Sequence, residues 1–189
     1  SVMHMGYIFL GIAAGTELAL KGAVILMFAH GISIALSFAL CGRMRNQLGT
    51  LEFDKLGGLA THAPMLTVVF AFAAFASIGL PGLANFAGEI MVFAGTFDAS
   101  LWSPEKLNAL QWTTILALWG VVISAVYMLR AYRKLFFGTA ASGLYMKDPA
   151  IGQRIPLLLL AAVLLIVGCC PGTLLDLIKS AWAAKVAAL

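Results

Sequence analysis

Three titratable side chains lie inside strongly apolar stretches of this sequence and are the residues best suited to chemistry. Glu89 is the only acidic residue well inside an apolar segment, and His4 and His30 stand in two other apolar segments. A carboxylate at the centre of a membrane costs about 2.5 kcal/mol or more, so it must be protonated, paired or hydrated. Imidazole titrates at about pH 6.5 and suits proton transfer. Together these residues predict a chain of protonatable groups through a membrane.

Each of these residues also has a structural interpretation. Glu89 could form an ion pair that holds two helices together, and a histidine inside a membrane often only bonds one helix to another. Their spacing along the chain does not establish that Glu89, His30 and His4 line one path. The proton pathway is therefore a hypothesis, and helix bracing is its rival.

Shortly before Glu89, a long apolar segment is interrupted by Gly79, Pro81 and Gly82. Proline removes a backbone donor and restricts the residue before it, and the glycines loosen the backbone further. The pattern predicts a discontinuous helix, broken near 79–84, and the alternative is a merely kinked helix. Broken helices persist at membrane depth only where protein or a water-filled cavity satisfies the freed backbone groups, and transporters place them beside ion pathways.

These residues need a membrane-spanning scaffold, and the composition of the chain predicts one. Of its 189 residues, 62% are hydrophobic and 11% are charged, whereas an ordinary soluble domain has about 25% charged residues. This excludes a soluble globule and predicts an all-α, polytopic transmembrane helix bundle with one discontinuous helix. We expect a single membrane domain over 1–189, with a partial helix at 1–16 and helices at 22–43, 63–97 (broken near 79–84), 111–137 and 155–179.

Other classes of site are not indicated by the sequence. Three cysteines, two of them adjacent, form no metal-binding pattern, and no phosphate-binding loop or haem motif is present. We expect no metal, no cofactor and no nucleic-acid partner. Basic residues gather in the segments 43–62 and 130–154, so the net charge of +4 is expected to reflect cytoplasmic loops.

Three stretches, in this order, resemble one family of membrane proteins. They are Ser-Val-Met-His-Met-Gly-Tyr at 1–7, Gly-Ala-Val-Ile-Leu-Met-Phe-Ala-His-Gly-Ile-Ser at 22–33 and Ala-Ser-Ile-Gly-Leu-Pro-Gly-Leu-Ala-Asn-Phe-Ala-Gly-Glu at 76–89. They resemble the antiporter-like subunits of the proton-translocating NADH:quinone oxidoreductase (respiratory complex I), of the subunit M or chain 4 type. Related subunits and Mrp-type antiporters typically carry Lys where this chain has Glu89, and subunit M carries Glu.

The resemblance is strong over residues 1 to about 98 and looser beyond. It implies a fold of fourteen transmembrane helices in two inverted five-helix repeats, of which this chain would supply the last five as a C-terminal fragment. The family's first half-channel and its central Lys have no counterpart here, so the chain alone would not hold a complete proton path. Glu89, His30 and His4 would belong to the C-terminal half of that path.

The resemblance also implies a function. The chain would translocate protons in the membrane arm of an NADH:quinone oxidoreductase, coupled to quinone reduction elsewhere in the complex. It would be a subunit of this translocase without a catalytic redox centre of its own and without bound flavin, NAD or cluster. Its expected partners are L- and N-type neighbours and lipid, in a bacterial inner membrane or an equivalent energy-transducing membrane. The alternatives are a membrane subunit of a related hydrogenase complex, a cation/proton antiporter and a purely structural membrane scaffold.

Overall fold

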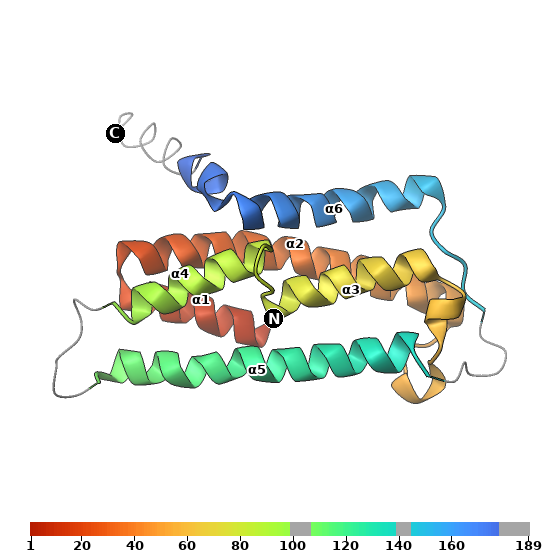
Figure 1. Ribbon diagram of the computed structural model, residues 1–189, viewed down its shortest axis with the longest axis horizontal. Helices are drawn as coiled ribbons and strands as arrows, with labels where there is room; N and C mark the ends of the chain where they lie inside the picture. Colours follow the sequence, from red (N-terminus) through yellow and green to blue (C-terminus); the bar gives the residue numbers. More distant parts are fainter. Residues whose placement is uncertain (99–106, 139–144, 178–189) are drawn as a thin grey trace.

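The computed structural model describes residues 1–98, 107–138 and 145–177 as a bundle of α-helices (Figure 1). The α-helices are α1 (Val2–Ala14), α2 (Glu17–Leu48), α3 (Pro64–Ile78), α4 (Ala84–Thr96), α5 (Ala109–Phe136) and α6 (Ile151–Cys169). Two short 3-10 turns, η1 (Phe53–Lys55) and η2 (Leu59–Thr61), connect α2 to α3. The described residues contain no β-strand. The predicted all-α class is confirmed.

The helices are long and apolar enough for a membrane bundle. Within the described residues, α2, α5 and α6 could each cross a membrane by length and composition. The 15 residues of α3 and the 13 of α4 are fewer than the roughly 20 that a crossing requires. These two helices follow one another along the side of α2 (Figure 1), and together they correspond to the helix expected at 63–97 with a break near 79–84.

The helix expected at 22–43 is longer at both ends, because α2 extends over Glu17–Leu48. The Thr16 side chain caps its start by accepting a hydrogen bond from the backbone N–H of Ala19 at 3.3 Å. Gly49 ends the helix in a left-handed conformation. The expected limits were too narrow because charged side chains extend along a helix toward water without ending it.

The helix expected at 155–179 is interrupted. The last residue of α6 is Cys169, Cys170 is not helical, and residues 171–177 are helical again. The cause is Pro171, because proline disfavours a helical backbone in the residue before it. The first residue of α6 is Ile151, ahead of the apolar run, since polar residues form part of its first turn. The last two residues of the expected helix lie outside the described part of the chain.

Four helix termini lie together at one end of the bundle: the C-termini of α2 and α5 and the N-termini of α3 and α6 (Figure 1). The Asp148 carboxylate caps α3 by accepting hydrogen bonds from the backbone N–H groups of Met65 and Leu66 at 3.2 and 3.0 Å. Lys134 Nζ donates to Asp54 Oδ1 at 2.6 Å. This hydrogen bond and the charge of Lys134 lower the pKa of the Asp54 carboxyl. These contacts tie the connections between helices to the bundle.

Glycine residues allow α2 and α4 to pack very closely. A Cβ atom added to Gly88 would lie 2.8 Å from the backbone nitrogen of Leu26, and one added to Gly22 would lie 2.6 Å from that of Val92. Neither approach is possible without a shift of backbone, so the contact depends on the absence of side chains at both positions. Because Glu89 follows Gly88, this close contact also determines where the Glu89 side chain lies.

We expect Gly88→Ala to destabilise the helix pair by about 1–3 kcal/mol, the usual cost of overpacking, since its methyl group would meet the backbone of Leu26. Gly31→Ala is the matched control, because a Cβ at this position of α2 has no heavy atom within 4 Å. The measurement is the detergent-induced or thermal unfolding midpoint of the full-length protein in its complex. Equal midpoints for the two variants would contradict the close α2–α4 contact.

Candidate functional site

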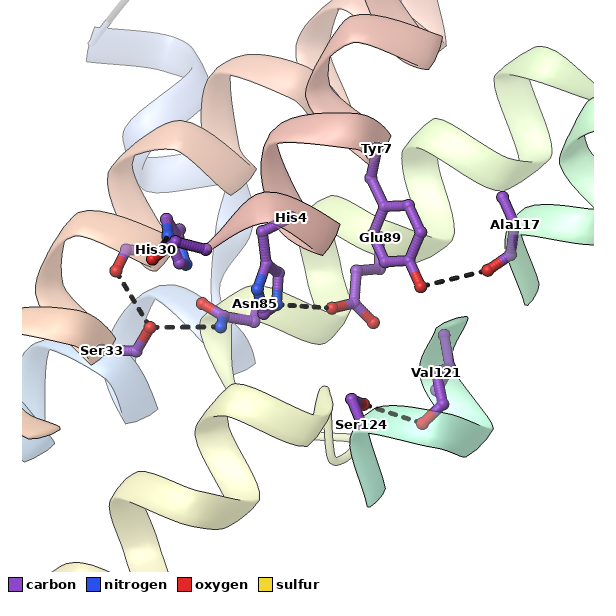
Figure 2. Close-up of polar contacts among 10 residues, drawn as sticks. His4, Tyr7, His30, Ser33, Asn85, Glu89, Ala117, Val121 and Ser124 are labelled. Carbon is purple, nitrogen blue, oxygen red and sulfur yellow. Dashed lines mark hydrogen bonds and ion pairs between the residues drawn. The ribbon is translucent and has the colours of Figure 1, made fainter. Parts of the chain in front are cut away.

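The helices α1, α2 and α4 bring His4, His30 and Glu89 into one cluster (Figure 2). Nε2 of His4 lies 3.2 Å from Oε1 of Glu89, and both side chains are buried. The two atoms are close enough for an ion pair but are not aligned for a hydrogen bond. The rings of His4 and His30 stack with their centroids 4.6 Å apart. His4 therefore lies between His30 and Glu89, an order that their positions in the sequence do not reveal.

The Glu89 carboxyl group lies against the helix break. A Cβ atom added to Gly79, the residue after α3, would collide with the carboxylate oxygens of Glu89. Gly79 and Gly82 both have a positive φ, 80° and 93°, a conformation that glycine adopts without strain. Pro81 lies in the turn between them and is exposed. Of the three residues predicted to break the helix, Gly79 is the one that places backbone without a side chain directly beside the acidic group.

One side of the break is covered by α6. The Cys169 thiol donates to the carbonyl oxygen of Gly82 at 3.6 Å. A Cβ atom added to Gly168 would lie 2.5 Å from Cα of Leu83, so the two backbones are in close contact there. Leu80 is 45% exposed in this chain. The expectation that the freed carbonyl groups meet water or neighbouring side chains stays a prediction for the intact protein.

Three polar residues to which the sequence had assigned no role complete the cluster. Nδ2 of Asn85 donates to Oγ of Ser33 at 3.3 Å, and Oγ of Ser33 is 3.0 Å from the carbonyl oxygen of His30. The Tyr7 hydroxyl donates to a backbone carbonyl of α5 at 3.1 Å. Asn85 and Ser33 each lie about one helical turn from Glu89 or His30, and residues so spaced share a helix face. That spacing is the signal by which the sequence could have indicated them.

Several polar atoms of this cluster have no hydrogen-bond partner within the described residues. Six buried side-chain nitrogen or oxygen atoms in the described residues lack one, and four of them are Nε2 of His4, Nδ1 of His30, Oδ1 of Asn85 and Oε1 of Glu89. Buried polar atoms nearly always bond to protein or to ordered water. A cavity of about 240 Å³ borders His4, His30 and Ser77, and a water molecule needs about 30 Å³. The space beside His4 and His30 is therefore large enough for several water molecules.

Proton transfer is the chemistry available at this site. A carboxyl group and two imidazoles can each take up and release a proton, and water can connect them. No three His, Cys, Asp or Glu side chains in the described part of the chain are grouped so that they could hold a metal ion. The site therefore consists of proton-carrying groups inside a membrane-type helix bundle.

Comparison with known proteins identifies the family of this chain. The family described as NADH:quinone oxidoreductase/Mrp antiporter, TM, matches residues 1–105, more than half of the chain. The chain belongs to this family. The matched residues include the whole of α1 to α4, which carry the predicted proton-pathway residues and the helix break.

Curated members of the NADH:quinone oxidoreductase/Mrp antiporter family are similar over most of this chain. NADH-quinone oxidoreductase subunit M of Pseudomonas aeruginosa is 35% identical over 181 residues, which are 94% of this chain and 33% of the relative. NAD(P)H-quinone oxidoreductase chain 4 1 of Synechococcus sp. (strain JA-3-3Ab) is 37% identical over 148 residues, which are 78% of this chain and 28% of the relative. The chain thus spans about a third of the length of these relatives.

A solved structure of the same family has the same fold. A chain of respiratory complex I from Thermus thermophilus with bound NADH superposes with a TM-score of 0.80 at 35% identity, covering 90% of this chain and 34% of that one. The resemblance to subunit M, or chain 4, that was predicted from the sequence is confirmed by these matches.

Proposed function

We propose that this chain moves protons across the membrane as part of the subunit M of an NADH:quinone oxidoreductase. The observation that supports the proposal is the 3.2 Å contact between Nε2 of His4 and Oε1 of Glu89, inside a cluster in which four buried polar atoms have no hydrogen-bond partner among the described residues. A purely structural ion pair has no need of the stacked second imidazole of His30 or of the adjoining cavity.

The geometry supports a path from His30 through His4 to Glu89. A proton passes between groups about 3 Å apart or through one connecting water. Transfer from protonated His4 to the Glu89 carboxylate converts an ion pair into a neutral pair. The two groups have a net charge of zero before and after the step, so no uncompensated charge is left in the low-dielectric interior. His30, whose ring stacks on that of His4, then supplies the next proton to His4 through a connecting water.

The helix break gives Glu89 a second neighbour on the side away from His4. The backbone of Gly79 lies against the carboxyl group, with no side chain of its own to separate the two. Backbone groups freed by a broken helix bind water at membrane depth. In this proposal Glu89 takes its proton from His4 and releases it toward the hydrated break.

The proposal also covers the neighbouring subunits and the membrane in which the chain lies. Redox chemistry takes place in other subunits, and this chain binds no flavin, NAD or iron–sulfur cluster. Its neighbours are L- and N-type antiporter-like subunits and lipid, in a bacterial inner membrane or an equivalent energy-transducing membrane. The end of the bundle where α2 and α5 end faces the cytoplasm, because it carries most of the basic residues.

The proposal is tested with the intact complex in proteoliposomes. Addition of NADH and a quinone should drive proton movement, which is measured with a pH-sensitive dye. A protonophore should abolish the signal. The family also includes Mrp antiporters, so a cation/proton antiporter is the second candidate. Proton movement driven by a sodium gradient without NADH would favour that alternative and contradict the proposal.

The contacts predict different effects for the three histidines. His4→Met should reduce proton pumping more than His30→Met, because His4 contacts Glu89 and His30 reaches it only through His4. Both should have smaller effects than loss of Glu89, since water can connect the groups on either side of a missing imidazole, whereas the acceptor carboxyl group has no substitute. His62→Met is the control, because His62 is exposed and its ring packs edge-on against Tyr145. Full proton-to-electron stoichiometry in both His4→Met and His30→Met would contradict the path.

A further inference from the structure

A groove of about 700 Å³ lies between α2 and α6, away from the proton-transfer cluster. Phe38 of α2 and Leu160 of α6 belong to its apolar part, and Arg43 and Gln153 belong to the part nearer the helix ends. A neighbouring pocket of about 470 Å³ shares Arg43 and Gln153 and adds Lys147. The two together form one recess, called here the α2–α6 recess, that is apolar at one end and basic at the other.

The length of α2 indicates where this recess lies in a membrane. Its 32 residues span about 48 Å at 1.5 Å per residue, which exceeds the roughly 30 Å of the hydrocarbon core. Arg43 lies about one and a half turns before the end of α2, and Phe38 lies deeper. The basic part of the recess is therefore at the level of the lipid head groups, and the apolar part is at the level of the acyl chains.

Among the residues that the structure describes, the positive charge of Arg43 has no acidic partner. Its guanidinium donates to Oε1 of Gln153 at 2.5 Å and to the carbonyl oxygen of Lys147 at 3.3 Å, both neutral acceptors. None of the ion pairs within the described residues includes Arg43, and its Nε is buried without a hydrogen-bond partner. The carboxylate of Asp148 borders the pocket but accepts hydrogen bonds from the start of α3. The recess thus has an excess of positive charge.

We propose that the α2–α6 recess binds one anionic phospholipid of the bilayer. Its phosphate lies at Arg43 and Lys147, and one acyl chain lies along Phe38 and Leu160. A guanidinium binds phosphate oxygens in a planar, two-point geometry, and basic pockets between transmembrane helices on the cytoplasmic side bind anionic head groups. A phospholipid combines a charged head and a long apolar tail, as the recess requires. Free phosphate would leave the apolar part uncovered, and a zwitterionic lipid would leave the positive charge uncompensated.

The test uses the intact complex in nanodiscs of phosphatidylglycerol and phosphatidylcholine. Its structure should contain a lipid in the α2–α6 recess with the head group at Arg43. Arg43→Gln should lose this lipid, whereas Arg45→Gln should keep it, because Arg45 is an exposed arginine of the same helix end that borders neither pocket. Three results would overturn the proposal: a protein segment filling the recess, a compact phosphate-sized ligand without a chain, or equal lipid occupancy in the two variants.

A second variant leaves the arginine and its hydrogen bonds in place. Gly42 borders the groove, and a Cβ atom there would have no heavy atom within 4 Å. Gly42→Leu should therefore fill the apolar part of the groove without disturbing the fold, and complex assembly is checked by native electrophoresis. Native mass spectrometry should then find one tightly bound phosphatidylglycerol fewer per complex than in the wild type. An unchanged lipid count in Gly42→Leu would contradict the proposed position of the acyl chain.

Discussion

Replacement of Glu89 by Gln is expected to reduce proton pumping at least severalfold while the complex still assembles. Glutamine has nearly the same shape, so it can occupy the space between His4 and the bare backbone of Gly79. It cannot bind and release a proton, and the transfer from His4 then has no acceptor. Glu89→Asp should retain part of the activity, since its carboxyl group remains but is one methylene farther from His4.

The measurement is the proton-to-electron stoichiometry of the intact complex in proteoliposomes, with NADH oxidation followed in parallel. Glu52→Gln is the control, because Glu52 is exposed and its ion pair with Lys55 is formed across one turn at the surface. This outcome also decides between proton transfer and helix bracing. A normal stoichiometry in Glu89→Gln would mean that Glu89 only holds helices together, and the proposed path would be wrong.

Replacement of Gly79 by Ala is expected to impair both stability and pumping. The backbone of Gly79 has φ 80°, a conformation that costs an ordinary residue about 1–2 kcal/mol. In addition, the new methyl group would collide with the carboxylate of Glu89. Because the carboxyl group is the far end of a flexible side chain, it should move away from the methyl group and be displaced from His4.

Gly82→Ala is the matched control for the backbone contribution. Gly82 has a similar positive φ of 93°, and a Cβ at this position has no heavy atom within 4 Å. Both variants should lower the unfolding midpoint, but only Gly79→Ala should also lower the proton-to-electron stoichiometry. Normal pumping in Gly79→Ala would contradict the contact between the break and the carboxyl group.

A double substitution isolates the collision itself. In a Glu89→Ala background the carboxylate is absent, so Gly79→Ala should lower the unfolding midpoint no more than Gly82→Ala does in the same background. The difference between the two backgrounds measures the coupling between residues 79 and 89. Equal effects of Gly79→Ala in both backgrounds would show that only backbone strain acts there.

Much of the fold could be predicted from the sequence because a membrane restricts the backbone conformations open to the chain. An apolar run of sufficient length must form a helix there, since every backbone polar group needs an internal partner. The cost of placing a charge in a membrane distinguishes Glu89 from the other acidic residues. The restricted backbone around Pro81 indicates the break. The expected ends of the helices were less accurate. A hydropathy pattern does not indicate the helix cap at Thr16 or the helix interruption before Pro171.

The sequence alone therefore determined the class of the protein, the kinds of residue able to carry a proton and the break beside them. Only the tertiary structure decided that His4, and not His30, contacts Glu89. The same holds for Asn85 and Ser33, which join the cluster across two helices. The physical reason is that these distances depend on how closely whole helices approach one another. That approach is set by the missing side chains of Gly22 and Gly88, which let α2 and α4 pack closely.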